Sequence, residues 1–118
     1  METYGKIWGT TSRLFCKNNV EICRITGIKG GESSTHKHCG KHSMFYVEHG
    51  SIAVSVSKDY GLTDRTILIA GQTTTLLPGE FHKFEVLEDN TICYEIYWVE
   101  LDPLDIERKD RGKLETSH

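Results

Sequence analysis

The amino-acid sequence predicts an all-β domain, folded as a sandwich or a barrel. Short runs of alternating apolar and polar residues recur along the chain, and turn residues such as Gly, Asn and Asp separate them. β-Branched and aromatic residues fill these runs, as strands prefer. No segment keeps a 3.6-residue apolar period long enough to indicate a core helix. Many short strands at regular spacing with Gly-marked turns are typical of sandwiches and barrels.

Seven strands are expected from this alternation. They are predicted at residues 20–28, 44–47, 51–57, 66–69, 73–77, 82–87 and 91–101. No repeat, linker or low-complexity segment interrupts them. We therefore expect one domain over residues 1–118, with a core of about residues 4–101 and a charged C-terminal segment at 102–118. A chain of this length can bury its own core without disulfides.

Composition narrows the class of partner. The 118 residues carry a formal net charge of −3 with the charges mixed along the chain, which argues against a nucleic-acid partner. The N-terminus lacks the apolar stretch of a signal peptide, and no apolar run approaches the length of a membrane span. The four cysteines have no C-x-x-C spacing and are expected to be free thiols. We expect a soluble cytoplasmic protein with a small-molecule ligand.

The histidines are grouped in a way that indicates a metal site. On a strand, residues i and i+2 point to the same face, so His36 and His38 can aim two imidazoles at one point. Neutral imidazole suits zinc, nickel, manganese and iron to differing degrees. His82, at the entry to a distant apolar strand, can supply the third ligand. These residues predict a site for a divalent metal whose identity stays open.

The spacing around these histidines resembles the two motifs of the cupin superfamily. Gly30, His36 and His38 match the opening of the first motif, and Gly50 matches its end. The second motif is represented by Gly71, Gly79 and His82, with its proline shifted one place to Pro78. The resemblance implies a single jelly-roll-type cupin β-barrel. Two departures stand out: Ser43 replaces the glutamate ligand of most cupins, and Val86 replaces the usual asparagine.

The fourth metal ligand is open between two arrangements. His42 lies in the alternative register that the cupin motif allows, three residues after His38, and is one candidate. Ser43 holds the position of the missing glutamate but is a poor ligand. Otherwise the site has three histidines plus water, an open arrangement that leaves room for a substrate.

A closer resemblance covers roughly residues 4–113. Three segments are similar to parts of the cupin domain of type II mannose-6-phosphate isomerases. They are Trp8-Gly9 near the N-terminus, and Asp105-Ile106-Glu107-Arg108 and Arg111-Gly112-Lys113 near the C-terminus. This resemblance implies a sugar or sugar-phosphate ligand. The sequence departs from that family at two positions: His36 stands where the family has Gln, and Lys113 stands where it has a terminal Arg.

Three functions are compatible with these features. In a metal-dependent isomerase, Lys113, Arg108 and Glu95 are the candidate catalytic residues, with Arg108 binding a phosphate or carboxylate. Glu95 alternates with its neighbours on a strand whose inward face the sequence does not determine, and an exposed position is the simpler interpretation. A three-histidine site also resembles that of non-haem iron dioxygenases. A non-catalytic binding or sensing module is the third alternative.

A homodimer is expected from the cupin resemblance alone. Cupins commonly dimerise by sheet edges or swapped N-terminal strands. The aromatic residues Trp8, Phe15, Tyr97 and Trp98 could serve such an interface, although their simpler interpretation is core or pocket wall.

Overall fold

The computed structural model describes residues 2–58 and 61–99, with residues 105, 107, 109, 112 and 114 beyond them. Every regular element among these residues is a strand, which confirms the all-β prediction. The strands are β1 (Glu2–Lys6), β2 (Gly9–Lys17), β3 (Val20–Gly27), β4 (His42–His49), β5 (Ser51–Ser57), β6 (Thr63–Ile69), β7 (Thr73–Leu76), β8 (His82–Val86) and β9 (Thr91–Trp98).

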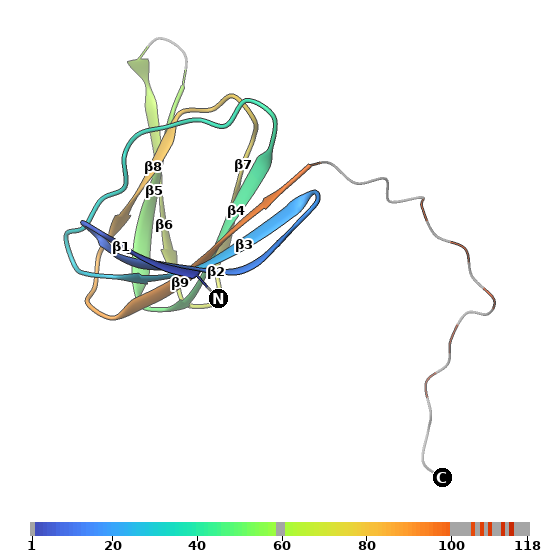
Figure 1. The fold of residues 1–118 in the computed structure, drawn as a ribbon. Helices are drawn as coiled ribbons and strands as arrows, with labels where there is room; N and C mark the ends of the chain where they lie inside the picture. Colours follow the sequence, from blue (N-terminus) through green and yellow to red (C-terminus); the bar gives the residue numbers. More distant parts are fainter. Residues whose placement is uncertain are drawn as a thin grey trace.

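The strands form two antiparallel sheets. The larger sheet has the order β1-β2-β3-β9-β4-β7, and the smaller has the order β6-β5-β8. The small sheet forms one side of the barrel, and the large sheet curves round from the N-terminal hairpin to β7 (Figure 1). The order places β9, the last strand, between β3 and β4, so that residues from three distant parts of the chain share one surface.

The core lies between the two sheets and follows the alternation of each strand. Along β4, Ser43, Phe45 and Val47 are buried while the residues between them are only partly buried. The same period of two runs through β8 and through the first half of β9. Since successive strand residues face opposite sides, each of these strands gives one face to the interior. Buried apolar side chains from both sheets form the core cluster: Ile25, Phe45, Val47, Ile52, Val54, Leu68, Leu76, Phe84, Val86 and Cys93.

All seven predicted strands are present, and two more were not predicted. The hairpin β1–β2 lies at the edge of the large sheet, and most side chains of β2 are exposed. A strand whose side chains are mostly exposed needs no apolar alternation, and the sequence Gly9–Lys17 shows little of it. The seventh strand was predicted to end at residue 101 and ends at Trp98.

The N-terminal hairpin is fastened to the barrel at its tip. The Trp8 ring meets Phe84 edge to face, with the ring centroids 5.0 Å apart. The Trp8 carbonyl accepts a 2.8 Å hydrogen bond from the Ile28 amide. Gly9 follows with a φ of 145°, and a Cβ there would overlap the carbonyl oxygen of Thr26. Only glycine fits this position, which explains the Trp8-Gly9 pair in structural terms.

The charged C-terminal segment lies largely beyond the described residues. Arg108 and Lys113, two of the predicted catalytic residues, fall outside them, and Asp105 is described and exposed. The part of the chain that the structure describes contains no helix with the length and apolar character of a membrane span.

Truncation of a core side chain tests the packing. Phe45 is fully buried, so we expect Phe45→Ala to lower the free energy of unfolding by about 3–5 kcal/mol, through lost burial and the cavity left behind. The matched control is Phe15→Ala, whose side chain is 47% exposed and should cost about 1 kcal/mol or less. Urea unfolding followed by circular dichroism measures both. Equal losses in the two variants would contradict this account of the core.

Candidate metal centre

The backbone pairs His36 directly with His82. The His36 amide donates to the His82 carbonyl at 3.0 Å, and the His82 amide donates back to the His36 carbonyl at 2.8 Å. This is a narrow antiparallel pair, in which both side chains leave on the same side of the strand pair. The centroids of the two imidazole rings are consequently only 4.7 Å apart.

The segment that carries His36 is not a strand, contrary to the prediction. It runs along β8 in irregular contact, with the Gly30 amide bonded to Val86 and the Ser33 amide bonded to Phe84. His36 is the last residue of this segment to pair with β8. The two imidazoles of the H-x-H pair still lie together, but backbone pairing with β8 positions the first of them rather than a shared strand face.

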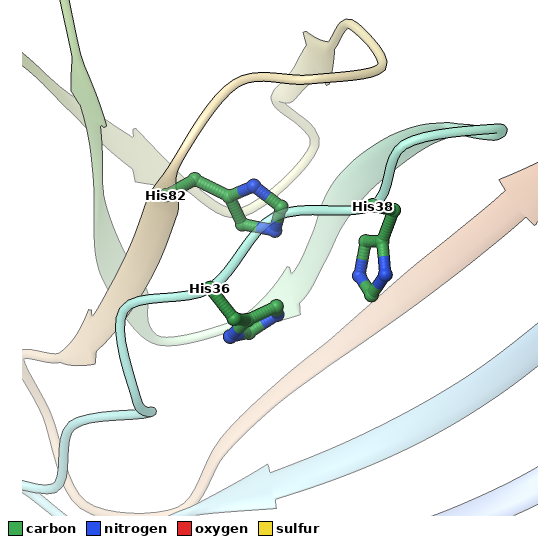
Figure 2. A group of neighbouring side chains, drawn as sticks. All are labelled: His36, His38 and His82. Atoms are coloured by element: carbon green, nitrogen blue, oxygen red, sulfur yellow. The ribbon is translucent and has the colours of Figure 1, made fainter.

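His38 lies beyond the paired segment, in the loop that leads to β4, and its ring lies close to those of His36 and His82. Its carbonyl accepts a 2.8 Å hydrogen bond from the amide of Gly79, which sits in the β7–β8 turn with a φ of 84°. A left-handed backbone of this kind favours glycine, and here it turns the amide toward the histidine loop. The ring of His38 lies 5.1 Å from that of His36 and 5.6 Å from that of His82 (Figure 2).

The nitrogen atoms of the three rings are arranged as metal ligands would be. One ligand nitrogen from each histidine lies within 4.8 Å of the other two. His36 Nδ1 is 2.9 Å from the Ser34 carbonyl, and His82 Nδ1 is 3.1 Å from the Glu80 carbonyl. Since a carbonyl only accepts, each Nδ1 carries the proton, which leaves the lone pair on Nε2. Ligating histidines are oriented in this way by their second nitrogen.

Buried ring nitrogens without partners also fit a metal. The Nε2 atoms of His38 and His82 are buried and have no hydrogen-bond partner among the described residues. A buried polar atom left without a partner is costly, and a metal ion would satisfy both. Burial lowers the pKa of His82 and, with nearby Lys41, lowers that of His38 to about 4. Both rings are therefore neutral near pH 7, the form that binds metals.

His42 lies apart from the three-histidine group. It begins β4 on the face opposite the buried Ser43, and its ring stacks on Trp98 with an interplanar angle of 15°. The metal-ligand group found among the described residues holds His36, His38 and His82 without it. Ser43 does face the interior, opposite Tyr97 of β9. The structure therefore offers the arrangement of three histidines with an open side.

A cavity of about 340 Å³ adjoins the group. His36 lines it together with Glu95 and Tyr97 of β9 and with Glu21 and Cys23 of β3. Its volume is at the lower end of the range for ligand pockets, which suits a small molecule. A molecule in the cavity would meet His36 of the three-histidine group as well as the acidic residues of the large sheet.

Glu95 faces this cavity and is 7% exposed, so the simpler interpretation of an exposed carboxylate was wrong. It lies opposite Cys23 on β3 and Phe45 on β4. Burial, opposed in part by a hydrogen bond from Tyr97, raises the pKa of Glu95 to about 7. One carboxylate oxygen, Oε2, is buried with no partner among the described residues. The group can hold or release a proton near neutral pH.

Tyr97 connects the two halves of the site and was predicted only as a core or pocket-wall residue. Its ring meets that of His38 edge to face at 5.0 Å, and its hydroxyl donates to Glu95. Burial raises its pKa, so the hydroxyl stays protonated. Lys41 lies 4.1 Å from the centre of the same ring. The alternation of β9 could have indicated Tyr97, because it shares a face with Glu95.

The comparisons with known proteins identify the fold. No protein-family model and no curated protein sequence matches the chain. Among solved structures, KdgF from Halomonas sp. has a TM-score of 0.70 at 14% sequence identity, covering 86% of this chain and 90% of that one. Oxalate decarboxylase from Bacillus subtilis has a TM-score of 0.74 at 14% identity, covering 83% of this chain and 27% of that one.

A structure concerned with the Mn(II) centres of Bacillus subtilis oxalate decarboxylase is similar in the same way. Its TM-score is 0.71 at 15% identity, with 83% of this chain and 28% of that one covered. The chain thus spans almost all of KdgF and little more than a quarter of the decarboxylase. Likeness at this identity establishes the fold, and the predicted single cupin β-barrel is confirmed. The finer resemblance to mannose-6-phosphate isomerases remains a prediction from the sequence.

Histidine substitutions test the ligand set. We expect His82→Ala to lower the affinity for Zn²⁺ or Co²⁺ at least about a hundredfold, because it removes one of three ligands. His42→Ala, which removes a neighbouring imidazole outside the group, should leave the affinity within about twofold. Isothermal titration calorimetry on purified protein measures both. If His42→Ala weakens binding as much as His82→Ala does, the assignment of ligands is wrong.

Glu95 should leave a signature in the pH dependence of stability. Its pKa is about 7 in the folded chain against an ordinary value of 4.5, so between these limits the unfolded chain releases the proton first. As pH rises through this window, the free energy of unfolding falls, by at most about 3.5 kcal/mol at about 1.4 kcal/mol per unit. Glu95→Gln should remove this contribution. We therefore expect the variant to gain stability relative to wild type from pH 4.5 to 7, as measured by urea unfolding. A constant difference would contradict the raised pKa.

Proposed function

We propose that this protein is a metal-dependent cupin that binds a small polyoxygenated molecule, of sugar or sugar-phosphate type, and isomerises it. The metal would be held by His36, His38 and His82. The observation that carries the proposal is the cavity that joins this group to a buried carboxyl group, Glu95. The three histidines are a candidate site for a Lewis-acidic metal ion, and Glu95 is a candidate proton carrier.

The metal would supply electrophilic chemistry. A divalent ion polarises a carbonyl oxygen and stabilises the negative charge that develops on it. Three protein ligands leave coordination positions for oxygens of the bound molecule. Zinc, nickel, manganese and iron are all candidates for this donor set. The Mn(II) centres of oxalate decarboxylase, which shares the fold, make manganese a reasonable first choice for reconstitution.

Glu95 would move the proton. Exchange between an aldose and a ketose transfers a proton between neighbouring carbon atoms, so it needs a base that can return what it takes. A carboxyl group whose pKa lies near 7 can do both at neutral pH. Tyr97, whose hydroxyl donates to Glu95 and whose ring lies next to His38, would orient the carboxylate.

The predicted roles of Arg108 and Lys113 belong to this proposal as well. The resemblance to type II mannose-6-phosphate isomerases implies that the C-terminal segment contributes to the site, with Arg108 binding an anionic group. Lys113 stands in the place of that family's terminal arginine. Neither residue is needed for the proton transfer proposed for Glu95.

Aldose–ketose exchange on metal-loaded protein tests the function. Deuterium incorporation at the carbon next to the carbonyl, followed by NMR in D₂O, reports the proton transfer directly. Glu95→Gln should lower the rate about 10²–10⁴-fold with the metal still bound, as expected for loss of a general acid–base. The matched control is Glu48→Gln, an exposed carboxylate outside the cavity that accepts a hydrogen bond from the Tyr94 hydroxyl.

Other outcomes would favour the alternatives. Iron in the purified protein, with oxygen uptake on thiols or diketones, would indicate a non-haem iron dioxygenase. Tight binding of sugars with no exchange would indicate a binding or sensing module. Unchanged exchange in Glu95→Gln would remove Glu95 from the mechanism and contradict the proposal.

A further inference from the structure

The N-terminal hairpin contributes basic residues to the lining of the cavity beside the three-histidine group and of its neighbour. Lys6 and Thr11 line the 340 Å³ cavity next to His36, and both also line an adjoining cavity of about 270 Å³ with Arg13. Glu21 and Cys23 also line both cavities, so the two cavities lie side by side. Residues of β1 and β2 therefore line this cavity beside Glu21 of β3, in the same sheet as Glu95 of β9.

Lys6 differs from Arg13 in its ionic contacts. Arg13 lies 3.4 Å from Glu21, so its charge is largely compensated. Glu95, with its pKa near 7, is about half protonated at neutral pH. Lys6 has no carboxylate within salt-bridge distance among the described residues. Lys6, an exposed residue that lines both cavities, thus offers an ammonium group with no carboxylate partner among the described residues.

The fold holds Lys6 at the cavity. Lys6 pairs with Gly9 across the two-residue tip of the β1–β2 hairpin. That tip is fixed by the Trp8 ring against Phe84 and by the hydrogen bond from Ile28 to the Trp8 carbonyl. The segment Ile7-Trp8-Gly9 thereby anchors the edge strand to the core and places Lys6 on the cavity wall.

We propose that Lys6 binds an anionic group, a carboxylate or a phosphate, of the small molecule whose other oxygens face the three-histidine group. The inference rests on the function proposed above and narrows its ligand to an acidic sugar or sugar phosphate. The Lys6 ammonium group donates to the anion, and Thr11 lies beside it on the same wall. Lys6 is thus a specificity residue rather than part of the proton transfer.

Matched sugars test the proposal. Mannose 6-phosphate is compared with mannose, and glucuronate with glucose, by calorimetric titration of metal-loaded wild type, Lys6→Gln, Lys6→Arg and Lys17→Gln. Lys17→Gln is the control, because it makes the same change in net charge at an exposed position outside both cavities. We expect wild type to prefer at least one anionic sugar by about tenfold or more, the scale of a charged hydrogen bond. Lys6→Gln should lose the preference, while Lys6→Arg and Lys17→Gln keep it.

The two pairs distinguish a phosphate ligand from a carboxylate ligand. Equal binding of charged and neutral sugars, no binding of either anion at millimolar concentration, or an unchanged preference in Lys6→Gln would overturn the proposal. Equal loss in Lys17→Gln would overturn it too, because overall charge would then explain the effect. The metal affinity of each sample is measured in parallel. Absent metal binding refutes the proposed function, whereas the ratio of affinities within a pair tests Lys6 by itself.

Discussion

The candidate site depends on one backbone interaction, the reciprocal hydrogen bonding of His36 and His82. It joins an irregular segment after β3 to the start of β8 and sends both imidazoles to the same side. The rest of the site follows from this pair. Gly79 ties the His38 carbonyl to the neighbouring turn, and the Ser34 and Glu80 carbonyls turn two Nε2 atoms toward the centre. Because these contacts are made by the backbone, the group is built before any ligand arrives.

The large sheet adds a carboxyl group and a phenol hydroxyl to the three histidines of the candidate site. The insertion of β9 between β3 and β4 brings Glu95 opposite Cys23 and Tyr97 opposite Glu21. Burial in this row keeps the Tyr97 hydroxyl protonated and brings the pKa of Glu95 into the neutral range. A cavity wall of this kind is costly to fold, since it buries polar groups with few partners. Such costs are typical of functional sites rather than of structural cores.

Sequence reasoning predicted the barrel because its buried strands alternate strictly, and it predicted the three histidines from their spacing. It missed β1 and β2; the mostly exposed side chains of β2 impose no apolar alternation on the sequence. The orientation of β9 was undetermined, since Ile92 and Ile96 on one face are as apolar as Cys93 on the other. The prediction placed the His36 and His38 side chains together because it assumed that both residues lie on one strand. This assumption was wrong. Pairing with β8 depends on contacts between residues 46 positions apart, which local patterns do not contain.

The proposed function requires that three histidines from two separate segments of the chain hold one metal ion. The most direct measurement is an anomalous difference map from crystals of metal-replete protein, recorded at the absorption edge of the metal. We expect a single strong peak within coordination distance of Nε2 of His36, His38 and His82, with the remaining ligands facing the cavity that Glu95 lines. No peak at this position in fully loaded protein, or a peak bound by other residues, would contradict it.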